Sequence, residues 1–595
     1  MQVNAQSVEL EWNVPISMRD GVRLNCTLYL PRSLPAPAPS ILLLTPYVTD
    51  TYHERGMYFA AHGLPFAIVD SRGRGESDGT FKPYALNEAQ DGYDAVEWLA
   101  SQPYCNGQVG MWGGSYNGMV QWTTAKERPP HLATIVPVAS PHLGTDVPMR
   151  CNILQSYMVQ WLGLVNGRAY HHEKFADNTW WSSIYRRWYE LGRPLCELDG
   201  IAGMPSEAFQ EWLAHPEPDA YWDTRNPTAA EYGQMDIPIL TITGSYDDDQ
   251  PGALAHYREH IRHAFPEARS KHFLIIGPWD HFGTRTPKAK FGGLEFNADS
   301  LVDLPKLHAE WYAWTMQGGT KPAFLKKRVT YYVMGAERWR YADTLEDVTS
   351  HHQDLYLDSA LNASDVFSSG TLGANRGAGQ PDAYTYDPGD DRKPEWDAEA
   401  SSDPASFVDQ SVLLALQGKA LVYHSAPFKE ATEISGFFEL SAWISIDCPD
   451  TDIYVSVHEI GLDGRSIQLT TDAVRARYRE GLRRPRLITT QEPLRYDFKS
   501  FTFVSREISA GHRLRLVVAP MGRLIQAAFT ERNFNSGGVV ARESVTDARA
   551  VCVRLFHDLD HPSVLRAPIG RAASSDEPGA PVGDYRTSAA NLQRP

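Results

Sequence analysis

The sequence predicts an α/β core that is interrupted by a helical insertion and followed by a β-sandwich. Three observations predict this architecture. Short apolar runs alternate with helical patterns in the first third of the chain, tryptophans crowd into a region without strand patterns, and the last third consists of β-rich segments between turns. With 595 residues, the chain is long enough for several domains of roughly 150 residues each.

The first part of the core is predicted from four apolar runs, at residues 40–45, 65–70, 108–112 and 132–138. Uninterrupted apolar strands are covered on both faces, which is typical of a mostly parallel sheet between two layers of helices. Residues 87–100 carry apolar side chains at helical spacing and predict a helix, with Asn87 as a candidate cap. We assign residues 1–145 to this part of the core.

The insertion is predicted at residues 146–235, which lack strand patterns and hold six of the sixteen tryptophans. We interpret this region as a helical cap. The parallel-sheet pattern then resumes, with strands expected at 238–243 and 273–276 and helices at 253–264 and 304–316. Residues 236–350 are therefore assigned to the second part of the core.

The sandwich is predicted at residues 351–566, where β-rich segments alternate with Gly, Pro and Asp turns. Its clearest strands are expected at residues 420–423, 436–444, 453–457 and 512–518. Residues 368–406 are rich in Gly, Asp and Pro and are predicted to form a surface loop. The Ala-, Ser- and Pro-rich tail at 567–595 is expected to be mobile.

Composition narrows the classes of function. The net charge of −17 argues against nucleic acid or an anionic membrane as the main partner, because both attract basic patches. Six scattered cysteines without a CxxC spacing predict neither a disulfide framework nor a zinc site. No apolar run approaches ~18 residues and no leader pattern is visible, so we expect a cytoplasmic protein without a membrane span. A chain trimmed of its leader would look the same.

The strongest local motif is V-G-M-W-G-G-S-Y-N-G at residues 109–118. A strand ending at a small-residue turn before a helix would hold Ser115 with its hydroxyl exposed at the carboxyl edge of the sheet. The amide of Tyr116, at the start of that helix, would point toward a developing oxyanion. The usual motif is G-x-S-x-G, but Asn117 occupies the fifth position here. A plain glycine-rich turn is the alternative interpretation.

A nucleophilic serine needs a base and a carboxylate that orients the base. Asp247 and His281 each follow one of the strands expected in the second part of the core, in the chain order Ser, acid, His. We therefore predict Ser115, His281 and Asp247 as nucleophile, base and acid. Asp248 and Asp249 are alternatives for the acid.

Several segments together resemble the CocE/NonD hydrolases, the cocaine-esterase-like and α-amino-acid ester hydrolases that are related to X-Pro dipeptidyl-peptidases. The resemblance runs from about residue 10 to 560. It is carried by L-T-P-Y at 44–47, D-S-R-G-R-G-E-S-D-G at 70–79, G-x-S-Y-x-G at 113–118, G-S-Y-D at 244–247, G-P-W-D-H at 277–281, V-M-G-A-E-R-W at 333–339, D-T-D at 450–452 and G-H-R-L at 511–514.

The resemblance implies an α/β-hydrolase core, a helical cap and a jelly-roll sandwich. It also implies that Tyr47 donates its hydroxyl to the oxyanion beside the Tyr116 amide, which fits its place after the strand at 41–45. We take Arg72, in the 70–79 loop, to tie loops together by pairing with carboxylates. No metal or organic cofactor is predicted. Members of the family often self-associate, so a homo-oligomer is left open.

The predicted reaction is two-step acyl transfer on a small-molecule ester or amide. Asp249 could hold a substrate ammonium, and a cap tryptophan such as Trp161 could line the substrate pocket; an ordinary loop acid and a packing residue are the alternatives. Three hypotheses remain: a serine esterase, which we favour, an amidase or peptidase such as a β-lactam acylase or X-Pro dipeptidyl-peptidase, and a catalytically inactive binding protein.

Overall fold

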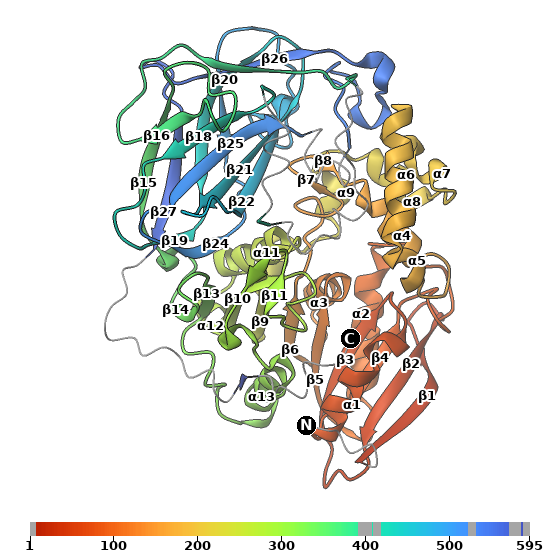
Figure 1. Ribbon diagram of the computed structural model, residues 1–595. Helices are drawn as coiled ribbons and strands as arrows, with labels where there is room; N and C mark the ends of the chain where they lie inside the picture. The colour runs from red at the N-terminus through yellow and green to blue at the C-terminus, as the bar shows by residue number, and fades with distance from the viewer. Residues whose placement is uncertain (1–6, 391–406, 409–417, 522–530, 571–584, 587–595) are drawn as a thin grey trace.

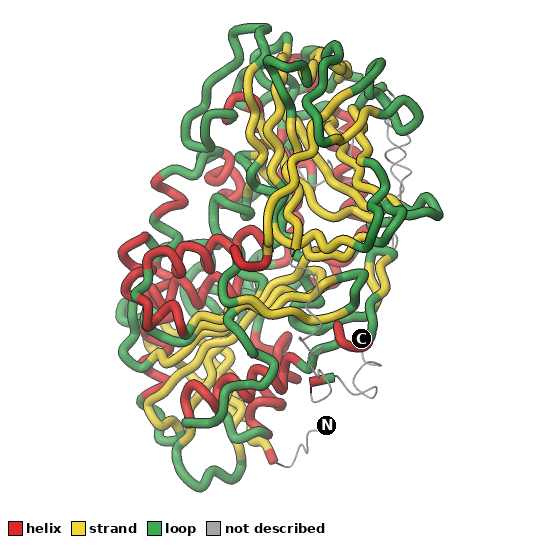
Figure 2. The backbone as a smooth tube through the Cα atoms, turned by 90° about the vertical axis from the view of Figure 1, so that its left-hand side faces the viewer, coloured by secondary structure: helices red, strands yellow, loops and turns green. Residues whose placement is uncertain are grey.

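The computed structural model describes residues 7–390, 407–408, 418–521, 531–570 and 585–586. The core sheet lies at the bottom of Figure 1, the sandwich lies above it, and the helices of the insertion lie beside both. Figure 2 shows the strands of the sandwich stacked above those of the core, with helices on both sides of the core sheet. The predicted fold class, an α/β-hydrolase core with a helical cap and a C-terminal β-sandwich, is confirmed.

The core sheet has ten strands in the order β1-β2-β4-β3-β5-β6-β9-β10-β13-β14. Pairing is parallel from β4 through β13 and antiparallel at both edges. The strands are β1 (Val8–Ser17), β2 (Arg23–Pro31), β3 (Ala38–Thr45), β4 (Phe66–Asp70), β5 (Cys105–Gly114), β6 (Leu132–Val138), β9 (Ile239–Tyr246), β10 (His272–Asp280), β13 (Val329–Val333) and β14 (Arg338–Ala342).

Helices cover both faces of this sheet, which explains its uninterrupted apolar strands. Along β3, Ile41 and Leu43 belong to one buried cluster, while Leu42 and Leu44 belong to the cluster on the other face. The first cluster packs against α1 (His53–Ala61) and α13 (Leu304–Gln317), and the second against α2 (Asn87–Ala100) and α3 (Tyr116–Lys126). The predicted helix at 87–100 is present, but Asn87 lies inside it and Leu86 occupies the cap position.

The insertion is helical, as predicted, but it begins with a two-stranded hairpin that the sequence did not reveal. The hairpin pairs β7 (Met149–Arg150) with β8 (Ile153–Leu154). The helices that follow are α4 (Tyr157–Leu164), α5 (His172–Ala176), α6 (Asn178–Leu191), α7 (Leu198–Ile201), α8 (Glu207–Leu213), α9 (Ala220–Asp223) and α10 (Ala229–Gln234). The chain then returns to the core through β9, α11 (Gln250–His263), α12 (Pro266–Ser270), β10 and the small hairpin of β11 (Lys290–Phe291) and β12 (Leu294–Glu295).

Among the residues that the structure describes, the sandwich has thirteen strands. They are β15 (Thr349–Asp358), β16 (Gly370–Gly373), β17 (Asp382–Tyr386), β18 (Leu421–Ser425), β19 (Thr432–Gly436), β20 (Glu439–Ile446), β21 (Asp452–Ile460), β22 (Ser466–Arg475), β23 (Leu494–Phe498), β24 (Val504–Ile508), β25 (Arg513–Pro520), β26 (Val551–Phe556) and β27 (Val564–Gly570).

Two expectations about this region need correction. The predicted surface loop at 368–406 contains β16 and β17, whose backbone groups pair with β15, β18 and β26. The sandwich also extends past residue 566, because β27 ends at Gly570. Most of the predicted mobile tail, 571–584 and 587–595, lies outside the described residues. Within it, Tyr585 is buried and donates a hydrogen bond to Glu310 of α13.

A buried ion network joins the sandwich to the cap hairpin. The Arg475 guanidinium contacts Asp452 and Glu531, each at 2.7 Å, and donates to the Asn152 carbonyl at 3.0 Å. Glu531 in turn accepts the amide N–H of Leu154 at 3.1 Å. Because every partner is charged or hydrogen-bonded, the network fixes the sandwich against the cap.

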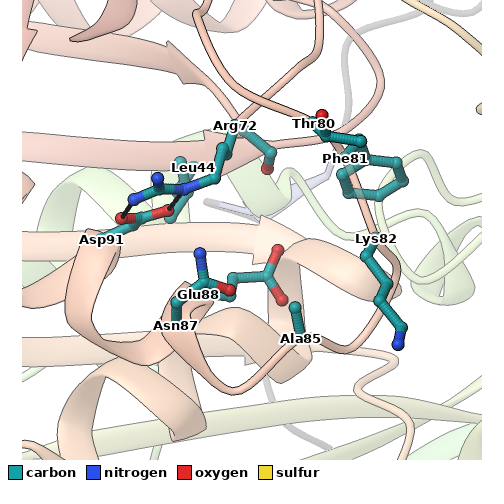
Figure 3. Close-up of a pocket in the computed structure, with 10 residues that line it drawn as sticks. Leu44, Arg72, Thr80, Phe81, Lys82, Ala85, Asn87, Glu88 and Asp91 are labelled. Atoms are coloured by element: carbon teal, nitrogen blue, oxygen red, sulfur yellow. Dashed lines mark hydrogen bonds and ion pairs between the residues drawn. The ribbon is translucent and has the colours of Figure 1, made fainter. Parts of the chain in front are cut away.

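The 70–79 loop has the structural role that was predicted for Arg72. The Arg72 guanidinium contacts the carboxylates of Asp91 at 2.6 Å and Asp20 at 2.7 Å, and these contacts tie the loop to α2 and to the β1–β2 turn. Figure 3 shows Arg72 facing Asp91, with Glu88 nearby. These residues line a pocket whose volume is about 20 Å³. This space holds little more than a water molecule.

In the described part of the chain, no helix is long and apolar enough to cross a membrane.

Candidate active site

Ser115 occupies a strained turn between β5 and α3. Its backbone has φ 62° and ψ −130°, a conformation that a non-glycine residue adopts only when its surroundings enforce it. The Ser115 amide donates to the Val138 carbonyl at 2.9 Å. A Cβ atom on Gly118 would lie 2.9 Å from that same carbonyl oxygen, so the helix approaches β6 closely only because residue 118 is glycine.

This geometry accounts for the displaced glycine of the motif. The Asn117 side chain donates from Nδ2 to the Tyr52 hydroxyl at 2.7 Å. Gly118, one residue later, makes the close approach to β6. Arg285 crowds the other side of the turn, because a Cβ atom on Gly114 would lie 2.5 Å from its Nη1. The turn therefore has the strand-turn-helix geometry of a nucleophile elbow, with its glycine shifted by one position.

His281 and Asp247 form a hydrogen-bonded pair. Nδ1 of His281 lies 2.8 Å from Oδ1 of Asp247, a carboxylate that is buried and also accepts hydrogen bonds from the Thr243 hydroxyl at 2.7 Å and the Asp249 amide at 3.1 Å. This pairing places the proton on Nδ1 and leaves Nε2 as the acceptor. Burial lowers the pKa of His281, but the charges of Asp249 and Asp247 outweigh it, and the pKa lies above its usual value.

Tyr47 lies just after β3, where its amide donates to the Thr45 hydroxyl at 3.0 Å. Its own hydroxyl contacts the Ser115 side chain and accepts a hydrogen bond from Nε1 of Trp161 at 3.2 Å. Burial raises the pKa of Tyr47 to about 12. The phenol is therefore neutral near pH 7 and keeps the proton that a hydrogen-bond donor needs.

Tyr116 begins α3, so its amide is one of the first-turn N–H groups that have no acceptor within the helix. Its side chain is anchored away from the sheet edge. The hydroxyl donates to Oε2 of Glu88 at 2.9 Å and accepts the Tyr84 amide at 3.0 Å. Burial raises the pKa of Glu88 to about 8, so this carboxyl is mostly protonated at neutral pH.

These groups surround one cavity of about 490 Å³. The core contributes Tyr47, Ser115, Tyr116 and His281, while Asp247 stands behind the histidine. The cap and the sandwich supply the remaining walls, through Tyr157, Met158, Trp161, Phe175, Tyr454, Thr471, Ala473 and Met521. The cavity thus lies where all three parts of the chain meet.

A second group of carboxylates faces His281. Asp248 and Asp249 line the cavity, and Oδ2 of Asp249 lies 3.7 Å from Nδ1 of His281. Asp146, at the start of the insertion, accepts the His142 amide at 2.9 Å and the Gly252 amide at 2.7 Å. Burial raises the pKa of Asp146 to about 8 and raises that of Asp249 well above its usual value.

The structure thus brings together all seven residues that the sequence singled out, with Asp247 in direct contact with the base. Sequence reasoning missed Thr243, Asp146, Arg285 and the sandwich residues of the wall. Thr243 could have been suspected, because it lies four positions before Asp247 at the end of the same strand. The others carry no signal in the sequence, since only the tertiary fold brings them to the site.

The X-Pro dipeptidyl-peptidase (S15 family) model matches residues 20–283, and the model of the X-Pro dipeptidyl-peptidase C-terminal non-catalytic domain matches residues 323–532. The chain is 27% identical to the cocaine esterase of Rhodococcus sp. (strain MB1 Bresler) over 94% of this chain and 98% of that protein.

Two solved structures share the fold. An α-amino acid ester hydrolase has a TM-score of 0.81 at 19% identity, over 96% of this chain and 98% of the other. An aminopeptidase from a marine sediment Thaumarchaeota archaeon has a TM-score of 0.78 at 21% identity, over 95% and 97%. Two consecutive domain models of one family together span most of the chain, and a relative matches it over nearly its full length. The chain therefore belongs to the X-Pro dipeptidyl-peptidase (S15) family.

Proposed function

We propose that the protein hydrolyses carboxylic esters through an acyl-enzyme on Ser115, with His281 as the base and Asp247 as the residue that orients it. One observation carries the proposal. A strained serine shares a cavity with a histidine whose Nδ1 is committed to a buried carboxylate at 2.8 Å. This arrangement leaves the other ring nitrogen free to accept a proton from the serine.

In the proposed reaction, the Ser115 hydroxyl attacks the ester carbonyl while Nε2 of His281 takes its proton. The negative charge of the tetrahedral intermediate develops beside the Tyr47 hydroxyl and the Tyr116 amide, which donate hydrogen bonds to it. Asp247 stabilises the imidazolium. His281 then gives its proton to the leaving alcohol, and a water molecule repeats the sequence to release the acid and regenerate Ser115.

The walls of the cavity support a small-molecule substrate with an apolar or aromatic group. Aromatic and apolar side chains of the cap and the sandwich line most of the space, and Trp161 is among them. We propose Trp161 and Asp249 as residues that contact the substrate. The Rhodococcus relative is named for an ester substrate, which favours ester hydrolysis.

One feature favours a second candidate function, the hydrolysis of amides or peptides with a free amino group. The buried carboxylate of Asp249 and the exposed carboxylate of Asp248 both line the cavity, where they could pair with a substrate ammonium. One of the solved structures with this fold is an aminopeptidase. This activity would use the same serine, base and oxyanion donors.

A substrate panel tests both candidates. Purified wild-type protein and Ser115→Ala are assayed with p-nitrophenyl esters and with aminoacyl and Xaa-Pro anilides, and both are treated with a fluorophosphonate probe. We expect ester turnover and labelling in the wild type and neither in Ser115→Ala. Ser140→Ala, a change at a buried serine that packs against Gly118, is the matched control and should keep both. Wild-type turnover by Ser115→Ala would end the proposal, and faster turnover of anilides would favour the second candidate.

A further inference from the structure

Trp161 is a cap residue that donates a hydrogen bond to Tyr47 of the proposed oxyanion hole. We propose that Trp161 is a positioning residue, whose indole N–H orients the Tyr47 hydroxyl so that the phenol proton points at the reacting carbonyl. The inference rests on the proposed function, since it requires Tyr47 to serve as an oxyanion donor. The contact itself is a hydrogen bond of 3.2 Å from Nε1 to Oη between two side chains that are 7% and 8% exposed.

The direction of the Tyr47 proton follows from the chemistry of the indole. Indole nitrogen donates a hydrogen bond and cannot accept one, so the phenol proton cannot point toward Trp161. The Tyr47 hydroxyl also interacts with the Ser115 side chain. With one acceptor position of the oxygen occupied by Trp161, its proton is left to face Ser115 and the carbonyl that Ser115 attacks.

The same hydrogen bond strengthens Tyr47 as a donor. A hydroxyl that accepts a hydrogen bond becomes more polarised and donates more strongly. The electrostatics of the site agree, because burial raises the pKa of Tyr47 whereas the Trp161 N–H lowers it. A phenol with a lower pKa stabilises an oxyanion better, provided that it keeps its proton at working pH.

Aromatic stacking holds the indole in place. The indole ring stacks on the ring of Tyr84, with 5.8 Å between the ring centroids and 5° between the ring planes. It also stacks on the ring of Tyr116, with a centroid distance of 5.7 Å and an interplanar angle of 18°. Tyr116 is fixed in turn by its hydrogen bond to Glu88. Trp161 therefore contacts both residues that supply the proposed oxyanion donors, through the Tyr47 hydroxyl and the Tyr116 ring.

A double-mutant cycle tests this role. Trp161→Phe keeps an aromatic ring but removes the N–H, and Tyr47→Phe removes the donor itself. On a small acetyl ester we expect Trp161→Phe to lower kcat about five- to tenfold, the worth of one neutral hydrogen bond, with little change in KM. The key expectation is that Trp161→Phe has no further effect on kcat in the Tyr47→Phe background. Trp161→His, which retains a ring N–H, should recover part of the loss.

Two controls separate positioning from packing. Replacing Trp161 by β-(3-benzothienyl)alanine keeps the shape of the side chain and removes only the N–H, so it should reproduce the loss in kcat even if Trp161→Phe folds poorly. Trp212 is another buried tryptophan, and its ring centroid lies 5.3 Å from that of Tyr84. The Trp212→Phe substitution should leave kcat unchanged.

Three results would overturn the inference: an undiminished kcat in the benzothienyl variant, an equal loss in the Tyr47→Phe background, or a loss on the small acetyl ester that appears in KM and leaves kcat unchanged. The proposed function has a separate test, because it fails only if Ser115→Ala retains turnover and labelling.

Discussion

Replacing Asp247 by Asn should nearly abolish turnover while leaving the fold intact. The carboxylate lies 2.8 Å from Nδ1 of His281, and in the proposed mechanism its charge stabilises the imidazolium that forms during proton transfer. At that distance and an effective dielectric constant of 20, the Coulomb interaction is about 6 kcal/mol. Dividing by 1.36 kcal/mol per decade gives a loss of about 10⁴ in kcat, which is the loss observed for the equivalent change in a serine protease triad.

The assay is kcat on a p-nitrophenyl ester between pH 6 and 9, with thermal denaturation to verify folding. Asp249 lies 3.7 Å from the same nitrogen and can supply part of the missing charge once it ionises. The loss should therefore shrink as pH rises, and Asp247→Asn/Asp249→Asn should remove that recovery. Asp343→Asn, at an exposed ion pair with Lys327, is the matched control. A drop in kcat of less than tenfold for Asp247→Asn would refute the assignment of Asp247 as the orienting acid.

Three other perturbations test the site and its frame. Because the base must be neutral and its pKa is raised, kcat/KM should fall on acidification with a midpoint above the ordinary histidine value near 6.5; a pH–rate profile with a lower midpoint would contradict this. Gly118→Ala should destabilise the fold by about 1–3 kcal/mol and impair turnover, because the new methyl group would lie 2.9 Å from the Val138 carbonyl oxygen. Thermal melting and the esterase assay measure the two effects. Gly200 has open space around it, so the control Gly200→Ala should change neither stability nor turnover. Arg475→Met should cost about 3–5 kcal/mol in denaturant unfolding, because it leaves two buried carboxylates without their cation; an unchanged midpoint would show that the network is dispensable.

The parts of the fold that could be predicted were those with a repeating physical cause. The run at 40–45 indicated a strand because both of its faces are covered by helices, and the same reasoning located β4, β5, β6, β9 and β10. The short strands β16 and β17 were missed because their stability comes from pairing with distant strands rather than from their own composition. The cap of α2 was also predicted one residue too late: the helix begins at Asn87, and Leu86 occupies the cap position.

The residues of the candidate site likewise fall into those that the sequence could predict and those that it could not. Ser115, Asp247 and His281 could be proposed from sequence because each follows a recognisable strand, and the carboxyl ends of parallel strands meet at one edge of the sheet. Met521 could not, because it reaches the cavity from the sandwich, and Asp146 could not, because it comes from the insertion and acts on Asp249 through its charge. The hydrogen bond from Trp161 to Tyr47 depends on how the cap is seated, and no spacing in the chain encodes it.

The Arg475 network has a practical consequence for engineering. The C-terminal sandwich is neither a removable accessory nor a module that can be exchanged freely, because its loss would strip partners from the Asn152 carbonyl and the Leu154 amide and would open one side of the cavity at Tyr454 and Met521. Libraries aimed at new substrate preferences should therefore randomise positions 454 and 521 together with those of the cap, and truncated or chimeric designs should keep both halves of this junction from the same parent.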